Sequence, residues 1–344
     1  MSAGTAGPGP ETLGSLSDEP ATQDPNSQKA KEIAGKSPMQ IALRRLAQDK
    51  VAVVCAVVVL FFVICAVFAG VIARMFGVSL ETGLASEYVD GLNNGLPKPE
   101  MGPPDGPFTW DHPMGVAPRT GEDNLAYWLY GCRVSLTIAT VATLIASTVG
   151  IVVGLVAGFI GGTVDKVLSF FIDMFLTIPF LLAALTLAPI LNERFNSADN
   201  YATIQKVSLV AVLSIFGWMG TARLIRGEVL SLREREFVQA ARVMGMPTSR
   251  ILFKELLPNL AAPIIISISL MLPAFVTLEA GLAFLGIGVT DGISWGQTIL
   301  KAQDFFKIYP QYLWQPVLGI IALVLSLNLL GDAIRDALDP KTRR

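Results

Sequence analysis

The sequence has few charged residues for its length. Lysine and arginine contribute 26 of the 344 residues and aspartate and glutamate 28, so 16% of the chain is charged, against about 25% in a typical soluble domain. Hydrophobic residues make up 52%. This scarcity of charge argues against soluble domains and requires long uncharged segments, which are typical of membrane-spanning helices.

Cysteine and histidine are also scarce. The chain has three cysteines and one histidine, without C-x-x-C or zinc-site spacing, which excludes a disulfide scaffold and disfavours a metal centre. We expect the cysteines to be buried packing residues. The ATP-binding pattern GxxxxGK[ST] and any nucleophile–base motif are absent. A net charge of −2 provides no basic field for nucleic acid. We therefore expect neither catalysis nor a bound metal in this chain.

Six uncharged or nearly uncharged runs are candidates for membrane spans of about 20 residues. They cover residues 51–73, 134–164, 167–191, 207–222, 256–278 and 309–331. Because lipid offers the backbone no hydrogen-bond partners, these runs should be helical. The predicted fold class is an all-α polytopic membrane protein with six transmembrane helices.

Lysine and arginine are distributed unevenly among the connecting segments. With the N-terminus inside, the inner segments hold 6, 1, 7 and 4 of these residues, a total of 18, and the outer segments hold the remaining 8. Since cytoplasmic segments carry the excess of positive charge, both termini are predicted to be cytoplasmic.

The same pattern predicts how the chain is divided. Residues 1–38, rich in Gly, Pro, Ser, Thr and acidic residues, are predicted to be a disordered cytoplasmic tail. The first transmembrane helix follows at 39–76, then an extracytoplasmic loop at 77–130. The transmembrane core is predicted at 131–334, with a cytoplasmic loop at 223–258, and a cytoplasmic C-terminus at 335–344.

The cytoplasmic loop has a helix–turn–helix pattern. Apolar residues at i, i+3, i+4 and i+7 define one helical face; they are Phe237, Ala240, Ala241 and Met244. Gly245 and Pro247 interrupt this pattern, because glycine can end a helix in the left-handed conformation and proline favours a new start. A second short helix is predicted to stop near Pro258. Periodicity alone allows either a pair of helices lying on the membrane surface or a docking element for a partner.

This loop resembles the EAA motif of ABC importer permeases. The shared features are Gln239-Ala240-Ala241, Gly245 and Leu257-Pro258, with Gln239 at the position of the motif's glutamate. In that family the loop docks in a groove on the ATP-binding subunit. The coupling residues that the resemblance implies here are Glu236, Phe237, Gln239, Ala240, Ala241, Met244, Gly245, Leu257 and Pro258.

Further segments resemble the C-type permease subunit of dipeptide and oligopeptide ABC importers. They are HPMG at 112–115, LYGCRVSL at 129–136, RGEVLSLREREF at 226–237, FLGIGV at 284–289, SWG at 294–296, NLLGD at 328–332 and RDALDP at 335–340. The resemblance covers residues 39–344 and implies a type I importer permease of the cell membrane that moves peptides by alternating access.

The resemblance also implies partners. They would be a second homologous permease subunit, two ATP-binding subunits that carry ATP and magnesium, an extracytoplasmic substrate-binding protein and the lipid bilayer, without nucleic acid. No cofactor would be bound by this chain itself. Nickel and metal-chelate importers share the permease family and remain an alternative, as do an ion-coupled secondary transporter and a membrane-anchored scaffold.

Two further features of the apolar runs have structural and functional interpretations. Small residues recur every four positions and would let helices approach closely; they are Ala142, Ala146, Gly150, Gly154, Gly158 and Gly162. We expect this stripe to pack inside the bundle rather than to line a path. Asp173 and Glu279 lie within apolar runs, where a carboxylate must face a partner or water. Structural or interfacial roles are expected for both, and an ion-coupling role is the alternative.

Overall fold

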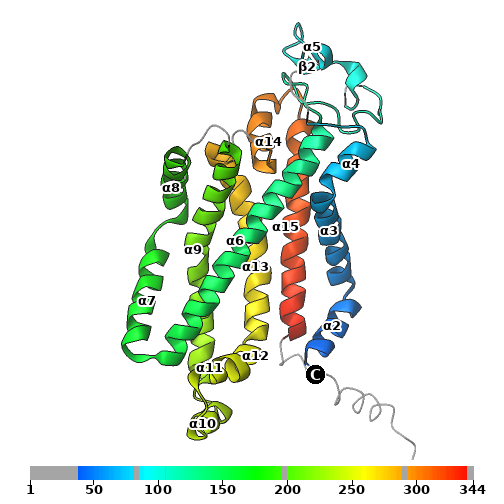
Figure 1. The fold of residues 1–344 in the computed structure, drawn as a ribbon. Coiled ribbons are helices and arrows are strands. Elements are labelled where there is room, and N and C mark those ends of the chain that lie inside the picture. Colours follow the sequence, from blue (N-terminus) through cyan, green and yellow to red (C-terminus); the bar gives the residue numbers. More distant parts are fainter. Residues whose placement is uncertain (1–37, 81–84, 105, 196–199, 289–292, 339–344) are drawn as a thin grey trace, which may run out of the picture.

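The structure is a computed structural model that describes residues 38–80, 85–104, 106–195, 200–288 and 293–338. The predicted tail therefore lies outside the described residues except for its last position, and so does most of the C-terminal segment. The last residue of FLGIGV and the last two of RDALDP also lie outside them. The described chain is a bundle of long helices with a small irregular segment at one end (Figure 1).

Helices account for most of the described residues. They are α2 Pro38–Gln48, α3 Lys50–Val67, α4 Ala69–Met75, α5 Ala85–Tyr88, α6 Asn124–Ile160, α7 Gly162–Thr177, α8 Phe180–Arg194, α9 Tyr201–Leu232, α10 Glu236–Val243, α11 Thr248–Arg250, α12 Leu257–Asn259, α13 Ala261–Leu282, α14 Trp295–Ala302 and α15 Gln311–Leu338. Shorter helical turns are η1 Pro99–Met101, η2 Ile251–Leu256, η3 Ala283–Ile287 and η4 Gln303–Phe305. Strands β1 Val89–Asp90 and β2 Leu96–Pro97 pair antiparallel, with Val89 opposite Pro97.

The number of membrane spans agrees with the six predicted from the sequence if α7 and α8 are counted together as one bent span. Among the described residues, α3, α6, α9, α13 and α15 are long and apolar enough to span a membrane, and α7 and α8 qualify together as a pair bent by 88°. The third run, residues 167–191, forms two helices with a break at Ile178 and Pro179. Ile178 and Pro179 have extended ψ angles of 121° and 112°, because a residue before proline avoids the α-helical conformation.

The longest helix, α6, begins earlier than its uncharged run. Asp123 caps it by accepting a hydrogen bond from the Ala126 backbone N–H at 2.9 Å, so the helix starts inside the segment predicted as the 77–130 loop. Its 37 residues extend about 55 Å at ~1.5 Å per residue, more than the ~30 Å of a hydrocarbon core. α6 accordingly crosses the bundle obliquely (Figure 1).

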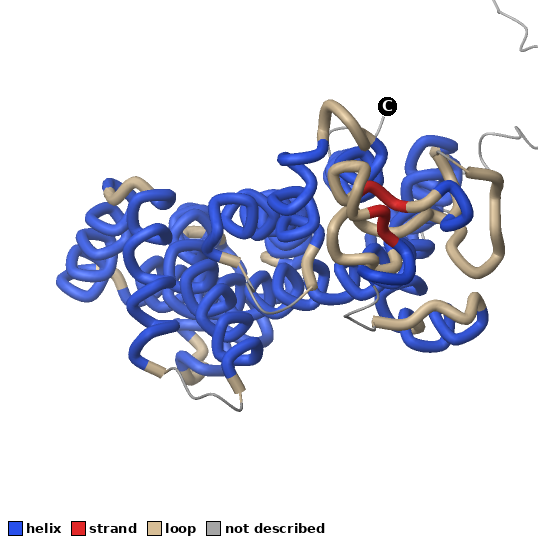
Figure 2. The backbone as a smooth tube through the Cα atoms, turned by 90° about the horizontal axis from the view of Figure 1, so that it is seen from above, coloured by secondary structure: helices blue, strands red, loops and turns tan. Residues whose placement is uncertain are grey.

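The two ends of the bundle differ in character. α2 and the end of α15 lie at the end that carries α10, and the paired strands lie at the opposite end (Figure 1). Seen from above, the strands and their loops lie over one side of the bundle only (Figure 2). The segments predicted to be inner therefore share one end. That this end faces the cytoplasm stays a prediction.

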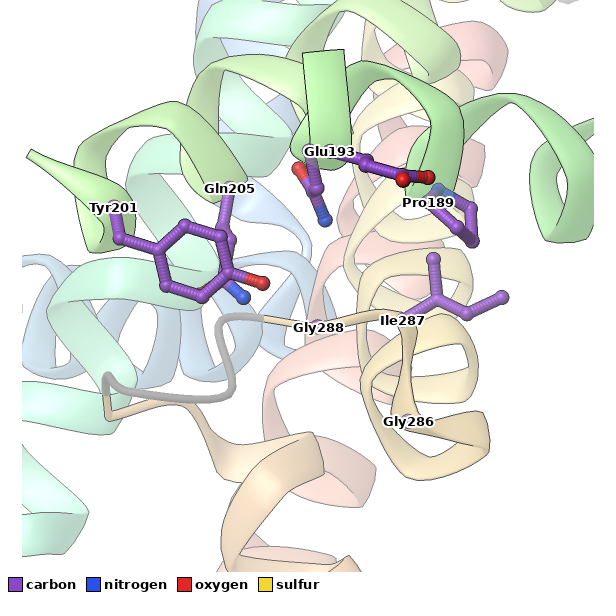
Figure 3. Close-up of a pocket in the computed structure, with 8 residues that line it drawn as sticks. Pro189, Glu193, Tyr201, Gln205, Gly286, Ile287 and Gly288 are labelled. Atoms are coloured by element: carbon purple, nitrogen blue, oxygen red, sulfur yellow. The ribbon is translucent and has the colours of Figure 1, made fainter. Parts of the chain in front are cut away.

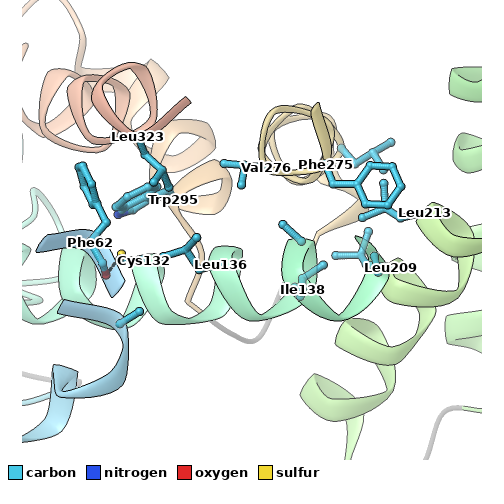
Figure 4. Close-up of a cluster of buried hydrophobic side chains, with 14 of the residues drawn as sticks. Phe62, Cys132, Leu136, Ile138, Leu209, Leu213, Phe275, Val276, Trp295 and Leu323 are labelled. Atoms are coloured by element: carbon cyan, nitrogen blue, oxygen red, sulfur yellow. Dashed lines mark hydrogen bonds between the residues drawn. The ribbon is translucent and has the colours of Figure 1, made fainter. Parts of the chain in front are cut away.

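The interior is organised around α6. Buried side chains from α3, α9, α13, α14 and α15 meet those of α6 in one cluster (Figure 4); members include Phe62, Cys132, Leu136, Leu213, Val276, Trp295 and Leu323. Trp295 is fully buried, and its Nε1 donates to the Trp128 carbonyl at 3.0 Å. All three cysteines are buried and free, which confirms that they are packing residues.

Candidate coupling loop and bundle interior

The loop between α9 and α13 forms two helical segments joined by a tight turn. α10 is followed by Gly245, whose φ of +74° is a left-handed value that favours glycine. α11 begins directly after Pro247. The second helical segment ends at Asn259, which confirms the prediction that it stops near Pro258. Pro258 lies in the first turn of α12, where no backbone N–H is needed, and the chain continues through Leu260 into α13.

One side of this loop packs into the bundle. Val238 and Ala241 of α10 are fully buried, in a cluster with residues of α6, α9 and η2. The Arg242 guanidinium lies 4.9 Å from the centre of the Phe159 ring of α6. Arg233 Nη1 donates to the Gly158 carbonyl at 3.1 Å. α10 is thus held directly against the ends of α6 and α9.

The other side of α10 is apolar and exposed. We call it the α10 surface; it consists of Phe237, Ala240, Val243 and Met244. Val243 is 88% exposed and Met244 70%. Of the four residues that define the predicted apolar face, only Ala241 turns inward. An apolar surface projecting from a charged loop is typical of a protein–protein contact.

The remaining predicted coupling residues lie around this surface. Glu236, Gln239, Gly245 and Pro258 are exposed and Leu257 is half-buried. Gln239 Nε2 donates to the Arg233 carbonyl at 3.2 Å, so the residue at the motif's glutamate position fastens the start of α10 to the end of α9. The structure brings Glu236 to Gly245 together on one short element, and Leu257 and Pro258 lie on the next.

Two ion pairs connect α7 to α9 near this loop. Asp165 receives two hydrogen bonds from Arg226, at 2.5 Å from Nε and 2.9 Å from Nη2. Asp173 pairs with Arg223 at 2.5 Å, with both side chains about 60% exposed. Asp173 therefore has a cationic partner that the sequence analysis did not name. The sequence did hold a signal. The spacing of the two aspartates places both on one face of α7, and the spacing of the two arginines places both on one face of α9.

The small-residue stripe of α6 faces α9. A Cβ atom added to Gly154 would lie 2.7 Å from the Ala222 carbonyl oxygen, and comparable clashes of 2.7 and 2.8 Å occur at Gly150 and Gly158. Such closeness is possible only without side chains. These contacts favour the packing role over a path-lining role. Gly162 does not belong to the stripe, because Gly161 ends α6 with a φ of +71°.

Glu279 is fully buried on α13, beside the hydroxyls of Ser135 on α6 and Ser294 before α14. Asp173 is exposed on α7, so the structure does not bring the two carboxylates together as a shared ion site would require. Within the described ranges, no group of three or more His, Cys, Asp or Glu residues could hold a metal ion. The single histidine, His112, instead pairs with Asp123 at 2.8 Å.

These features define a multi-pass helical membrane protein with an exposed apolar surface on α10 at one end. A sequence profile of the family described as "Binding-protein-dependent transport system inner membrane component" matches residues 150–344. A second profile, "N-terminal TM domain of oligopeptide transport permease C", matches residues 37–78. The chain therefore belongs to the family of binding-protein-dependent transport system inner membrane components.

Individual relatives extend over nearly the whole chain. The chain is 31% identical over 325 residues to the dipeptide transport system permease protein DppC of Alkalihalophilus pseudofirmus, which covers 94% of this chain and 96% of the relative. It is 29% identical over 329 residues to the oligopeptide transport system permease protein OppC of Bacillus subtilis, covering 95% and 97%. A solved structure of the inward-facing MetNI methionine ABC transporter superposes with a TM-score of 0.48 at 18% identity, over 62% of this chain and 96% of that chain.

Proposed function

We propose that this chain is the transmembrane permease subunit of an ATP-driven importer that moves di- or oligopeptides by alternating access. The family assignment supports an importer supplied by a binding protein. Peptide cargo is supported by relatives named for dipeptide and oligopeptide transport, and these names favour peptides over nickel. A second homologous permease subunit would complete the path, and two ATP-binding subunits, with ATP and magnesium, would drive it.

The observation that carries this proposal is the exposed α10 surface. An ATP-binding subunit would bind this surface, and the movement of that subunit on ATP binding would shift α10. Because α10 shares a buried cluster with α6 and α9, and only Leu260 separates α12 from α13, a shift of α10 would move three spans. Close-packed contacts transmit such a displacement rather than absorb it.

The arrangement of the two ends supports the direction of transport. The excess of Lys and Arg favours a cytoplasmic location for the α10 end, where the ATP-binding subunits would work. The irregular segment with β1 and β2 then lies outside, where an extracytoplasmic binding protein would dock. This orientation gives each partner its own end of the bundle.

A substitution on the α10 surface tests the proposal. The chain carrying Met244→Asp is expressed with its ATP-binding subunits, purified gently and assayed for the ATPase that co-elutes. Because loss of one anchoring side chain from an interface centre commonly weakens binding about tenfold or more, most of the ATPase should be lost. Ser231→Asp is the matched control, since Ser231 is exposed on α9 beside the loop but outside the α10 surface. Equal retention of ATPase by both variants would overturn the proposal.

A further inference from the structure

A cavity of about 310 Å³ lies between the end of α8, the start of α9 and the turn that follows η3 (Figure 3). Since α9 runs from Tyr201 at this cavity to Leu232 at the α10 loop, the cavity is at the end of the bundle opposite α10. Under the proposed orientation this is the extracytoplasmic end, where substrate would be released by its binding protein.

Polar side chains from two helices line this cavity. Tyr201 and Gln205 of α9 lie on one side of the cavity, and Glu193 of α8 lies across from them with its carboxylate on the side of Pro189 (Figure 3). The Oδ1 atom of Asn192, also on α8, is buried and has no hydrogen-bond partner among the described residues. The cavity therefore presents a carboxylate, a phenol and two amide groups.

The described lining of the cavity carries a negative charge. Glu193 is the only charged residue among those that line it in the described part of the chain, where no Lys or Arg joins it. The end of α8 and the start of α9 present opposite partial charges to the cavity, and these offset each other. The sign of the field is therefore set by the Glu193 carboxylate.

The third wall is formed by Gly286, Ile287 and Gly288, whose two glycines expose the backbone. Gly286 has a φ of +81°, and a Cβ atom there would meet nothing within 4 Å. Gly288 has no such room, since its Cβ would lie 2.6 Å from the Ala283 Cβ. The wall therefore turns at Gly286 and leaves open space beside it, which allows the main chain of a ligand to approach.

We propose that this cavity binds the terminal α-ammonium group of a peptide, with Glu193 as its counter-ion and Asn192, Tyr201 and Gln205 as hydrogen-bond partners. An ammonium group donates three hydrogen bonds and accepts none, which matches a cavity rich in acceptors with a single negative charge. A volume of about 310 Å³ is at the lower end of small-molecule sites and suits one terminal residue. This inference rests on the proposed function and assigns it a contact for one end of the substrate.

The test uses the complete transporter in proteoliposomes, with ATP and labelled trialanine as the probe. Glu193→Gln removes the charge and keeps the size. Because an exposed ion pair contributes up to about fivefold in affinity, we expect the KM for trialanine to rise about fivefold with little change in kcat. Asp304→Asn is the matched control, an exposed acidic residue in η4 that does not line the cavity, and its KM should equal that of the wild type. Glu193→Asp keeps the negative charge, so its KM for trialanine should lie close to that of the wild type.

A second measurement reads out the cavity directly. Pro189 lines the cavity and is exposed, and the three native cysteines of this chain are buried, so Pro189→Cys provides one accessible thiol on this chain. Trialanine should slow its alkylation in the wild-type background and should do so less in the presence of Glu193→Gln. An unchanged KM in Glu193→Gln, or alkylation that trialanine does not slow, would overturn this inference alone. Absence of ATP-dependent uptake by the wild type would overturn the proposed function and this inference with it.

Discussion

Replacing Gly154 with alanine should loosen the contact between α6 and α9. The new Cβ would lie 2.7 Å from the Ala222 carbonyl oxygen and 2.9 Å from the Ile225 Cβ, closer than the 3.0 Å that Cβ atoms keep from other heavy atoms. Overpacking of this kind costs about 1–3 kcal/mol. Alanine is also favoured over glycine by about 1 kcal/mol in a helix interior. This gain opposes the overpacking cost, so the free energy of unfolding of Gly154→Ala alone would be a poor test.

Gly220 provides the control that removes the contribution of helix propensity. It lies within α9, and a Cβ there would meet nothing within 4 Å, so Gly220→Ala gains the propensity without the clash. The two variants should therefore differ by the full overpacking cost of about 1–3 kcal/mol. At about 2–4 °C per kcal/mol, Gly154→Ala should melt roughly 2–12 °C below Gly220→Ala.

The assay is thermal unfolding of the purified chain alone in detergent, followed by tryptophan fluorescence at one scan rate. The chain is used without partners because a partner subunit could cover the open face at Gly220 in the assembled transporter. Equal melting temperatures for the two variants would refute the close α6–α9 approach on which the bundle depends.

Three further predictions follow from the loop, the ion pairs and the cysteines. Gly245→Val forces a β-branched residue into a left-handed φ at a cost of about 1–2 kcal/mol and should lower the peptide transported per ATP hydrolysed. Gly245→Asn should retain coupling, and equal coupling in both variants would contradict the turn. Arg226→Gln removes a partly buried, doubly hydrogen-bonded pair and should cost about 1.5–3 kcal/mol, measured by thermal unfolding. Arg223→Gln breaks an exposed pair and should cost about 1 kcal/mol or less, so an equal loss would argue against this ranking. Maleimide should label the native cysteines only after denaturation in SDS, and rapid labelling of the folded chain would show that they are accessible; they are Cys55, Cys65 and Cys132.

The membrane spans could be predicted from the sequence because the relevant signal is local. An uncharged run of sufficient length must be helical in lipid, and every such run contains a helix in the structure. The break in the third run lies at Pro179, a position where the sequence allows a kink, and α7 and α8 are bent there by 88°. A proline inside a span can kink a helix or end it, and the surrounding packing decides which. Pro273, for example, lies within continuous α13.

The coupling loop was predicted in outline, and its two faces were not. Periodicity identified α10 and the turn at Gly245. It did not separate Val238 and Ala241, which pack inward, from Phe237 and Met244, which are exposed. That distinction depends on where α6 and α9 end, and neighbouring residues do not encode it.

The cavity beside Glu193 was missed for a related reason. Its lining comes from three separate stretches of sequence that share no spacing, so only the folded arrangement brings them together. The pairing of Asp165 with Arg226 likewise needed α7 and α9 to be placed side by side.

The central claim is that this chain forms part of an ATP-driven path for peptides. The most direct measurement is accumulation of labelled trialanine in proteoliposomes that contain this chain, its partner permease and the ATP-binding subunits, with the binding protein added on the side that carries the β1–β2 segment. We predict accumulation that requires ATP and all of these subunits. Accumulation that persists without the ATP-binding subunits, or none in the complete system, would contradict the account.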